Sequence, residues 1–377
     1  MSKTLQDYAT LINDTIQSNE INHYITTANM CQNLGGIDTF KNINIPQGKV
    51  RSFQKNDVLL SNIDPWHRQV YMAKQKGGCS SDVLVFRAKH IDSATLFAIL
   101  SSQSFINYVC LGSVGSKRKR GDKTHMMDFK IPTINFTIAK IFNSIQNKIE
   151  NNHKINELLH KILELLYEQY FVRFDFLDEN NKPYQTSGGK MKFSKELNRL
   201  IPSGWSVRFL NHKIVSTYQP KTISKTLLND SYSYSVYGGG GIIGRFTEYN
   251  HEQSEFIISC RGQCGISYLT LPKSWITGNA MVIRPTKSYT SKTYLYHTIK
   301  KYKLTNYITG SVQPQITRQN LSTMPILIPK RKTLNKWNNI SSLLWNLIHN
   351  NMQSTQTLTA LRDFLLPLLL TQQVKPQ

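Results

Sequence analysis

The chain contains two copies of one pattern, about 200 residues apart. Gly112-Ser113-Val114 recurs as Gly310-Ser311-Val312, and Asp57–Ser61 recurs in pattern as Glu255–Ser259, both at an offset of 198. An offset held over more than 100 positions indicates two copies of one structural unit, related by approximate two-fold symmetry. A protein built in this way can bind two similar ligands at a fixed distance from each other.

Each copy ends in a long segment whose apolar residues have helical spacing. Ile131-Pro132 and Ile328-Pro329 close the two globular parts, at an offset of 197. Asn151-Asn152 and Asn350-Asn351 interrupt the two long segments, at an offset of 199. The predicted organisation is a first domain over 1–132, a central helix over 133–172, a polar linker over 173–200, a second domain over 201–329 and a final helix over 330–372.

The two long segments carry heptad-like apolar stripes. The first stripe runs from Ile134 to Leu166, and a helix of about 36 residues would be roughly 54 Å long. The second runs from Ile340 to Leu365 and is predicted to end at Pro367. Because so narrow a stripe requires another helix against it, the two segments are natural partners. In an antiparallel pair, their asparagines would meet at mid-length.

Short runs rich in branched apolar residues, such as Val83–Arg87, predict strands in both globular parts. The predicted fold class is therefore α+β. Two similar mixed α/β domains are joined by a pair of long antiparallel helices that form a coiled-coil spacer, with pseudo-two-fold symmetry.

The charge balance indicates a polyanionic partner. The chain has 46 Lys and Arg against 23 Asp and Glu, a net charge of +23. Double-stranded DNA is the expected partner. An anionic membrane surface is the rival, although the charge is spread through both halves, and distributed charge could also serve solubility alone. The first residues contain no apolar signal sequence and no stretch is long enough to span a bilayer, so the chain is expected to be cytoplasmic.

The sequence contains no recognisable catalytic, cofactor or metal site. Gly238–Gly241 is not followed by the Lys and Ser or Thr of a phosphate-binding loop, and no Gly-x-Gly-x-x-Gly follows a strand. The odd count of five cysteines does not suggest a disulfide framework, and no histidine pair completes a zinc site with Cys260 and Cys264. A non-catalytic chain without cofactor is therefore favoured over an enzyme with an unrecognised nuclease site.

Several residues of the first copy are candidates for DNA contact. Four adjacent cations repel one another unless anions neutralise them, and phosphates would do so. These cations are Lys117, Arg118, Lys119 and Arg120. Trp66 and Arg68, which follow a predicted strand, are further candidates. The alternatives are a solvated loop for the cations and a core or capping aromatic for Trp66.

The second copy offers amides where the first offers charge. The second copy has glutamines and an arginine in the loop that matches Lys117–Arg120. Glutamine can form two hydrogen bonds with adenine, and arginine can form two with guanine. The candidates are Gln313, Gln315 and Arg318 in that loop, Arg261 and Gln263 on a tight turn after a strand, and Tyr237 and Arg245 around the glycine run. The copies would then read different sequences; ordinary loop variation is the alternative.

A series of motifs in this order resembles one family. The motifs are Ile201–Trp205 (IPSGW), Tyr237–Gly244 (YGGGGIIG), Arg261–Gly265 (RGQCG), Trp275–Ala280 (WITGNA), Gly310–Thr317 (GSVQPQIT) and Leu361–Pro367 (LRDFLLP). Together they resemble the specificity subunit of type I restriction–modification systems, over almost all of the chain. The first copy lacks the Ile-Pro-x-Gly-Trp opening, and its Gly-Ser-Val loop is basic.

This resemblance implies two target recognition domains, each reading one half of a bipartite asymmetric DNA target, with the long helices setting the gap. It also implies docking of methyltransferase subunits, two in number, which hold the adenosylmethionine and flip the adenine. Motor-nuclease subunits complete the restriction complex. The alternative is a stand-alone architectural or regulatory DNA-binding protein, which would bind duplex without a partner.

Overall fold

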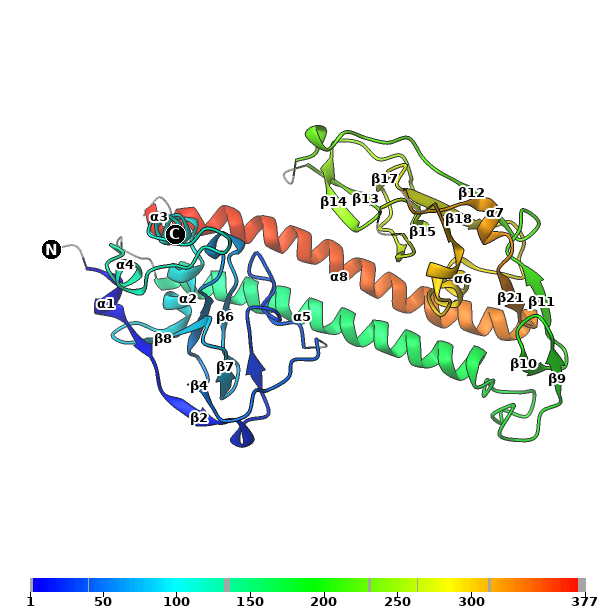
Figure 1. Cartoon of the computed structure of the whole chain (residues 1–377), viewed down its shortest axis with the longest axis horizontal. Helices are drawn as coiled ribbons and strands as arrows, with labels where there is room; N and C mark the ends of the chain where they lie inside the picture. Colours follow the sequence, from blue (N-terminus) through cyan, green and yellow to red (C-terminus); the bar gives the residue numbers. More distant parts are fainter. Residues whose placement is uncertain are drawn as a thin grey trace. The chain divides into compact units, whose positions relative to one another are not determined.

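The computed structural model describes residues 3–39, 41–131, 136–229, 232–262, 264–310 and 313–371. Residues Pro132, Ile134, Gln263, Ser311 and Val312, named above, lie outside this description. The chain forms two compact units: unit 1 comprises Met1–Ile155 and Asn351–Gln377, and unit 2 comprises Asn156–Asn350. The division falls inside the two longest helices, α5 (Phe136–Tyr167) and α8 (Arg331–Thr371), both labelled in Figure 1.

Unit 1 is built on a four-stranded antiparallel sheet with the order β1-β8-β5-β6. Its strands are β1 (Ala9–Ile12), β8 (Val83–Ala88), β5 (Val58–Ser61) and β6 (Val70–Met72). Alternate side chains point to opposite faces. Val58 and Leu60 join the core under the helices, and Leu59 joins a second core on the other face. Both faces are covered, which explains why the strands are continuously apolar.

The remaining elements of unit 1 cover these two faces. A second sheet has the order β2-β4-β7-β3, with β2 (Thr15–Gln17), β4 (Lys49–Phe53), β7 (Gly77–Cys79) and β3 (Tyr24–Ile25). The helices are α1 (Leu5–Tyr8), α2 (Ser93–Ser101), α3 (Gln103–Leu111) and α4 (Lys123–Met127), with 3-10 turns η1 (Ser18–Glu20) and η2 (Pro65–His67). Phe142 of α5 and Leu366 of α8 extend the core into the long helices.

Unit 2 contains a four-stranded antiparallel sheet with the matching order β12-β18-β15-β16. Its strands are β12 (Val215–Tyr218), β18 (Ala280–Pro285), β15 (Phe256–Ser259) and β16 (Ser267–Leu269). Helix α6 (Lys292–Lys300) follows β18 as α2 follows β8. Side chains cap both helices: Asp92 accepts from the Thr95 N–H, and Ser291 from the Tyr294 N–H. The repeated sequence therefore folds into repeated elements.

Smaller sheets complete unit 2. They are β14-β13-β17, with β13 (Tyr234–Gly238), β14 (Gly241–Phe246) and β17 (Trp275–Ile276), and the pairs β9 (Met191–Ser194) with β10 (Arg199–Pro202), β11 (Ser206–Phe209) with β21 (Pro325–Ile328), and β19 (Ile308–Thr309) with β20 (Gln315–Ile316). The short helices are α7 (Arg318–Leu321), η4 (Lys225–Leu227) and η5 (Leu304–Tyr307).

Each repeat contains an ion pair at the same place, beside its two central strands. In unit 1 the Arg87 guanidinium donates to both oxygens of the buried Asp57 carboxylate, at 2.8 Å each. In unit 2 Arg284 donates to Glu255 Oε1 at 3.0 and 2.6 Å. Asp57 and Glu255 open the repeated strand run noted in the sequence, so these pairs occupy matching positions of β5 with β8 and of β15 with β18.

Two expectations about the connections are wrong. The segment 173–200, expected to be a polar linker, carries β9 and the start of β10, and its Phe174 and Phe176 pack on Trp205 at 5.6 and 5.1 Å between ring centroids. Two aromatics in a polar stretch suffice to fold it onto the domain. Pro367 lies inside α8 rather than ending it, because a proline near a helix end removes only one internal hydrogen bond.

Within each unit, α5 and α8 contact each other in antiparallel register. In unit 1 the Asn152 side-chain amide donates to Thr355 Oγ1 at 3.2 Å, and the Arg362 guanidinium donates to Gln146 Oε1 at 3.0 Å. In unit 2 the rings of His160 and Trp345 lie 5.0 Å apart. A short π-helix, Glu168–Val172, continues α5 beyond Tyr167.

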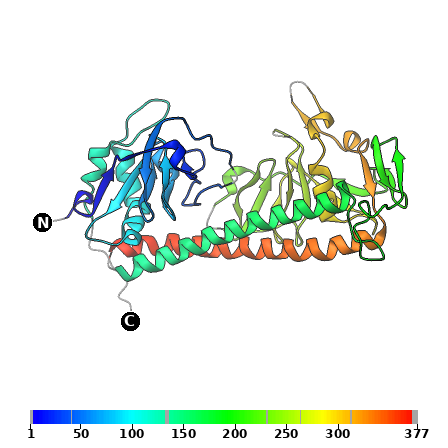
Figure 2. The ribbon, with the colours of Figure 1, turned by 90° about the horizontal axis from the view of Figure 1, so that it is seen from below.

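Only part of the heptad stripe is buried, at Ile145 and Ile149 of α5 in unit 1 and at Ile348 of α8 in unit 2. In unit 2 the residues of α5 that pack inward are Leu163 and Tyr167. Stripe positions on both helices are exposed instead: Leu158, Ile162 and Leu165 on α5, and Ile340, Leu343 and Leu347 on α8. The globular part of unit 2 covers one face of its helix segments and leaves the opposite face open (Figure 2). The inward positions carry aromatic and polar residues, which an apolar count does not detect.

Among the described residues, length and composition identify no single helix able to cross a membrane. By the same two criteria, one bent pair of helices, α2 with α3, could cross a membrane together; their axes differ by 59°.

Candidate nucleic-acid interface

In unit 1 the basic loop and the segment after β5 form one cluster. Val114 and Arg120 exchange both backbone hydrogen bonds, at 2.9 and 2.8 Å, and Arg120 also forms a bridge with Ile63. The Lys119 N–H donates to Asp64 Oδ1 at 3.1 Å, and the Asp64 N–H donates to Lys119 O at 2.8 Å. The turn requires Gly115, whose φ is +123° and where a Cβ would lie 2.4 Å from Arg118 O.

The cations of this loop differ in their partners. Arg120 forms an ion pair with Asp82 at 3.0 Å. Lys117, Arg118 and Lys119 are exposed and form no ion pair with any residue that the structure describes. Three adjacent cations without an ion-pair partner among the described residues are therefore available to an external anion.

Trp66 and Arg68 have different surroundings. Trp66 lies in η2, two residues from Asp64, and 47% of it is exposed, so it stands beside the basic loop. Arg68 points inward: its guanidinium donates to Ser101 O at 3.1 Å and lies 3.7 Å from Asp363. Burial lowers the pKa of Arg68. Arg68 therefore does not face outward, as the expected DNA contact requires. Its own backbone is left-handed at the end of η2, and this turns its side chain toward the helices.

Unit 2 brings the matching pair of segments together. Arg261 forms a bridge with Gln315, as Ile63 does with Arg120. The Ile316 N–H donates to Cys260 O at 3.1 Å, and Cys264 Sγ lies 3.2 Å from Pro314 O. The side chains that emerge here are exposed: Arg261, Gln313, Gln315 and Arg318. Gln263 lies outside the described residues.

The glycine run forms the tip of the β13–β14 hairpin and reaches the same cluster. A Cβ on Gly239 would lie 3.1 Å from Arg261 O. Tyr237, expected to contact DNA, is buried beneath it, and its hydroxyl accepts from the Leu271 N–H at 3.0 Å. Arg245 donates to the carbonyls of Tyr232 and Ser233, and so holds the base of the hairpin. Tyr237 is thus enclosed within the domain, and the half-buried Arg245 is engaged by carbonyls at the base of the hairpin.

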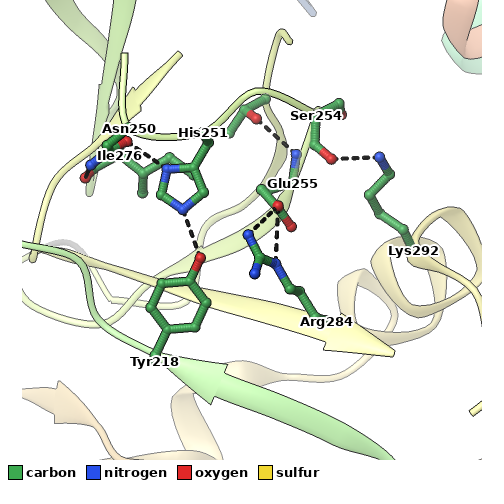
Figure 3. Close-up of polar contacts among 9 residues, drawn as sticks. Tyr218, Asn250, His251, Ser254, Glu255, Ile276, Arg284 and Lys292 are labelled. Carbon is green, nitrogen blue, oxygen red and sulfur yellow. Dashed lines mark hydrogen bonds and ion pairs between the residues drawn. The ribbon is translucent and has the colours of Figure 1, made fainter. Parts of the chain in front are cut away.

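Unit 2 also contains a polar cluster that the sequence did not reveal (Figure 3). Asn250 is oriented by Ile276, which donates its N–H to Oδ1 at 2.9 Å and accepts from Nδ2 at 3.0 Å. His251 Nδ1 therefore donates to Asn250 Oδ1, which leaves Nε2 to accept from the Tyr218 hydroxyl at 2.7 Å. Burial lowers the pKa of His251 and raises that of Tyr218, so both are neutral at pH 7.

The same cluster joins several elements. Arg284 pairs with Glu255, and its guanidinium lies 5.1 Å from the centre of the Tyr218 ring. Lys292 of α6 donates to Ser254 O at 2.5 Å, and burial lowers its pKa. Figure 3 shows the groups meeting over β12 and β18. Because the Tyr218 hydroxyl is already engaged and its pKa is raised, this cluster braces the sheet and offers no activated nucleophile.

Among the described residues, no group of three or more His, Cys, Asp and Glu side chains could hold a metal ion.

Each of the two units carries one polar loop cluster, and the chain has a net charge of +23. Residues 202–360 match the family model described as the type I restriction modification DNA specificity domain. The resemblance to type I restriction–modification specificity subunits is therefore confirmed.

Two known proteins illustrate the similarity. The chain is 22% identical to the type I restriction enzyme MjaIX specificity subunit of Methanocaldococcus jannaschii, over 62% of this chain and 56% of that protein. The match thus spans little more than half the length of this relative. The crystal structure of a type I restriction–modification S subunit from M. genitalium is 15% identical, with a TM-score of 0.63 over 98% of this chain and 96% of that chain, and shows the shared fold.

Proposed function

We propose that this chain is the DNA-reading subunit of a type I restriction–modification complex and that each unit contacts one half of a bipartite, asymmetric target. The observation that carries the proposal is the repeated pairing of Ile63 with Arg120 and of Arg261 with Gln315. In both repeats it joins the segment after a central strand to the Gly-Ser-Val loop. Two equivalent clusters with different side chains suit two different half-sites.

The long helices would set the gap between the half-sites. Helix α5 has 32 residues and is about 48 Å long, enough for the roughly 34 Å of ten base pairs. In this proposal the helices form a coiled-coil spacer and relate the two units by pseudo-two-fold symmetry. Adding four residues to each helix beside the Asn pairs would lengthen the spacer by about 6 Å. We expect an altered gap and unchanged half-site sequences in the methylome; an unaltered gap would contradict this role.

The open apolar face of unit 2 supports docking of a methyltransferase subunit, and the repeat would supply a second docking site. Six large apolar side chains on the uncovered side of α5 and α8 favour a helical partner. Leu343→Asp should abolish co-purification with the modification subunit and leave the fold intact, because Leu343 is exposed. Leu227→Asp, at an exposed leucine outside α5 and α8, is the control. Motor-nuclease subunits would join the same assembly.

Catalysis would reside in the partner subunits, so the chain itself is proposed to be non-catalytic. Mapping methylated adenines in cells with and without the gene tests the whole proposal. A bipartite motif should disappear from the methylome when the gene is removed. Persistence of every motif, with the purified chain binding duplex tightly alone, would favour a stand-alone DNA-binding protein instead.

The basic loop gives a sharper test. Replacing Lys117, Arg118 and Lys119 by alanine should weaken binding of all sequences and reduce the slope of log affinity against log salt by about three. Lys221→Ala with Lys225→Ala, on the surface of unit 2, controls for the loss of two surface charges elsewhere. An unchanged salt slope would place the phosphate contacts elsewhere.

A further inference from the structure

Two aliphatic side chains beside the basic loop are strongly exposed. Leu111 is 85% exposed and Val114 is 70% exposed, more than any other large hydrophobic side chain among the described residues. Leu111 ends α3, and Val114 lies three residues later on the strand-like pairing with Arg120. The two therefore stand at the edge of the cluster that also holds Lys117–Lys119.

The backbone around these side chains is firmly held. The Ser113 hydroxyl donates to Val109 O at 2.7 Å, and Val114 is fixed by both hydrogen bonds to Arg120. Gly112 leaves room for the His125 ring, which stacks on Tyr108 at 4.0 Å; a Cβ on Gly112 would lie 2.2 Å from that ring. A rigid apolar tip loses little conformational entropy when a partner covers it.

The neighbouring charges limit the choice of partner. A surface that covers Leu111 and Val114 must also accept the cations of the loop, so it must be anionic and present apolar groups. Duplex DNA meets both requirements in its major groove, where the thymine 5-methyl is the apolar group on the base edges. The residue of unit 2 at the position of Leu111 is the polar Thr309.

We propose that Leu111 and Val114 recognise thymine methyl groups in the half-site bound by unit 1. This inference rests on the proposed DNA-reading function and adds a base-specific role for two apolar residues. Removing one contacted methyl should lower affinity about fourfold, the transfer free energy of one such group.

The experiment replaces thymine by uracil in one half-site at a time and measures binding by the chain in complex with its modification subunits. Uracil in one half-site should weaken binding about fourfold per contacted methyl. The Leu111→Ala, Val114→Ala double variant should bind the thymine and uracil duplexes equally at that half-site, and still discriminate at any other. Leu227→Ala, at an exposed leucine of unit 2, should retain the full difference.

Equal binding of both duplexes by the unchanged protein would overturn the inference, as would a double variant that still discriminates, or a half-site without thymine. These outcomes differ from failure of the proposed function, in which no duplex is bound with sequence preference. A fold change in the double variant can be recognised independently by its circular dichroism.

Discussion

Units 1 and 2 carry the same central sheet but attach it to the long helices through different chemistry. In unit 1, Gln146 and Glu150 of α5 and Arg362 of α8 are buried between the helices and the globular part. The residues 199 positions away, at the matching places in unit 2, are Trp345, His349 and Leu163. One attachment is a polar network, and the other is aromatic and apolar.

The polar network of unit 1 is built around a buried cation. Besides its bond to Gln146, Arg362 contacts its neighbour Asp363 at 3.1 Å, and Gln146 donates to Leu34 O at 2.5 Å. Burial lowers the pKa of Arg362. Such a network requires one geometry, since any shift leaves a charge unpaired, but it adds little stability over an apolar contact.

The attachment in unit 2 is an aromatic cluster. Phe171 lies 4.8 Å from Tyr294, 5.5 Å from Trp337 and 5.9 Å from Trp205 between ring centroids. The Tyr167 hydroxyl donates to Thr298 Oγ1 at 3.0 Å and is otherwise enclosed. Aromatic burial supplies more stabilisation than the polar network does. The two repeats thus share the sheet but differ in how it is attached to the long helices. The polar network of unit 1 fixes one geometry, and the aromatic cluster of unit 2 adds more stability.

The largest effect should come from Phe171→Ala. Removing this ring opens a cavity in the aromatic cluster and should destabilise unit 2 by about 3–5 kcal/mol. Amide hydrogen exchange should show lost protection in unit 2 and little change in unit 1. Phe97→Ala, which removes a ring packed on Phe142 in unit 1, is the matched variant and should show the opposite pattern. Equal loss in both units would mean that the attachments are not independent.

Arg362→Leu introduces the residue that unit 2 has at the matching position. We expect a loss of about 3 kcal/mol, because Gln146 Oε1 loses its buried partner and Asp363 keeps only the more distant Arg68. The effect should appear as earlier exchange of unit 1 amides, with unit 2 unaffected. A neutral or stabilising result would show that the polar network is replaceable by apolar contact and would remove the distinction drawn between the attachments.

The sequence predicts the repeat because both copies retain glycine turns and apolar strand runs at fixed offsets. It also predicts that Lys117–Arg120 and Gln313–Gln315 occupy equivalent loops of the two copies, but not that each loop pairs with the segment after a central strand. It misplaces side chains whose direction depends on one backbone angle. Arg68 ends a 3-10 turn with φ of +48°, and Tyr237 falls on the inward side of β13. No local pattern carries that information.

The helices show a second limit of sequence patterns. Apolar periodicity correctly indicates long helices, but it identifies only part of their buried side, such as Ile145 and Ile149. Gln146, Glu150 and Arg362 are polar and buried, while Leu158 and Leu343 are apolar and exposed. The heptad pattern treats each helix as if it packed against one other helix only. Here each helix has a globular part and another helix on its buried side, and an open face that we propose is covered by a further subunit.

Acid should weaken the aromatic attachment. Burial first, then Lys300, His160 and Lys301, lowers the pKa of His297 to about 3, and burial lowers that of His349 to about 4. Between these values and about 6.5 the unfolded chain binds more protons, so stability falls as the pH falls through this window. At pH 5 His297 alone should account for about 2 kcal/mol.

The variant His297→Phe tests this assignment. It keeps a ring against Tyr167 and removes the titrating group, so about 2 kcal/mol of the loss between pH 7.5 and pH 5 should disappear. Urea unfolding followed by tryptophan fluorescence reports mainly on unit 2, which holds Trp205, Trp275, Trp337 and Trp345. An identical pH dependence in the variant would assign the titration to another group.

The smallest effect distinguishes the two sheets themselves. At the start of the sheet, unit 2 has the Tyr218–His251–Asn250 chain, whereas β1 of unit 1 supplies only apolar and threonine side chains. Tyr218→Phe keeps the ring beneath Arg284 and removes one hydrogen bond, so about 1 kcal/mol of stability should be lost. The freed His251 Nε2 would then be unpaired in a site that disfavours charge, and water entering there should speed exchange at the Ile276 amide. If exchange at Ile276 is unchanged while stability falls, the phenol acts through packing alone and the polar chain does not hold the Ile276 backbone.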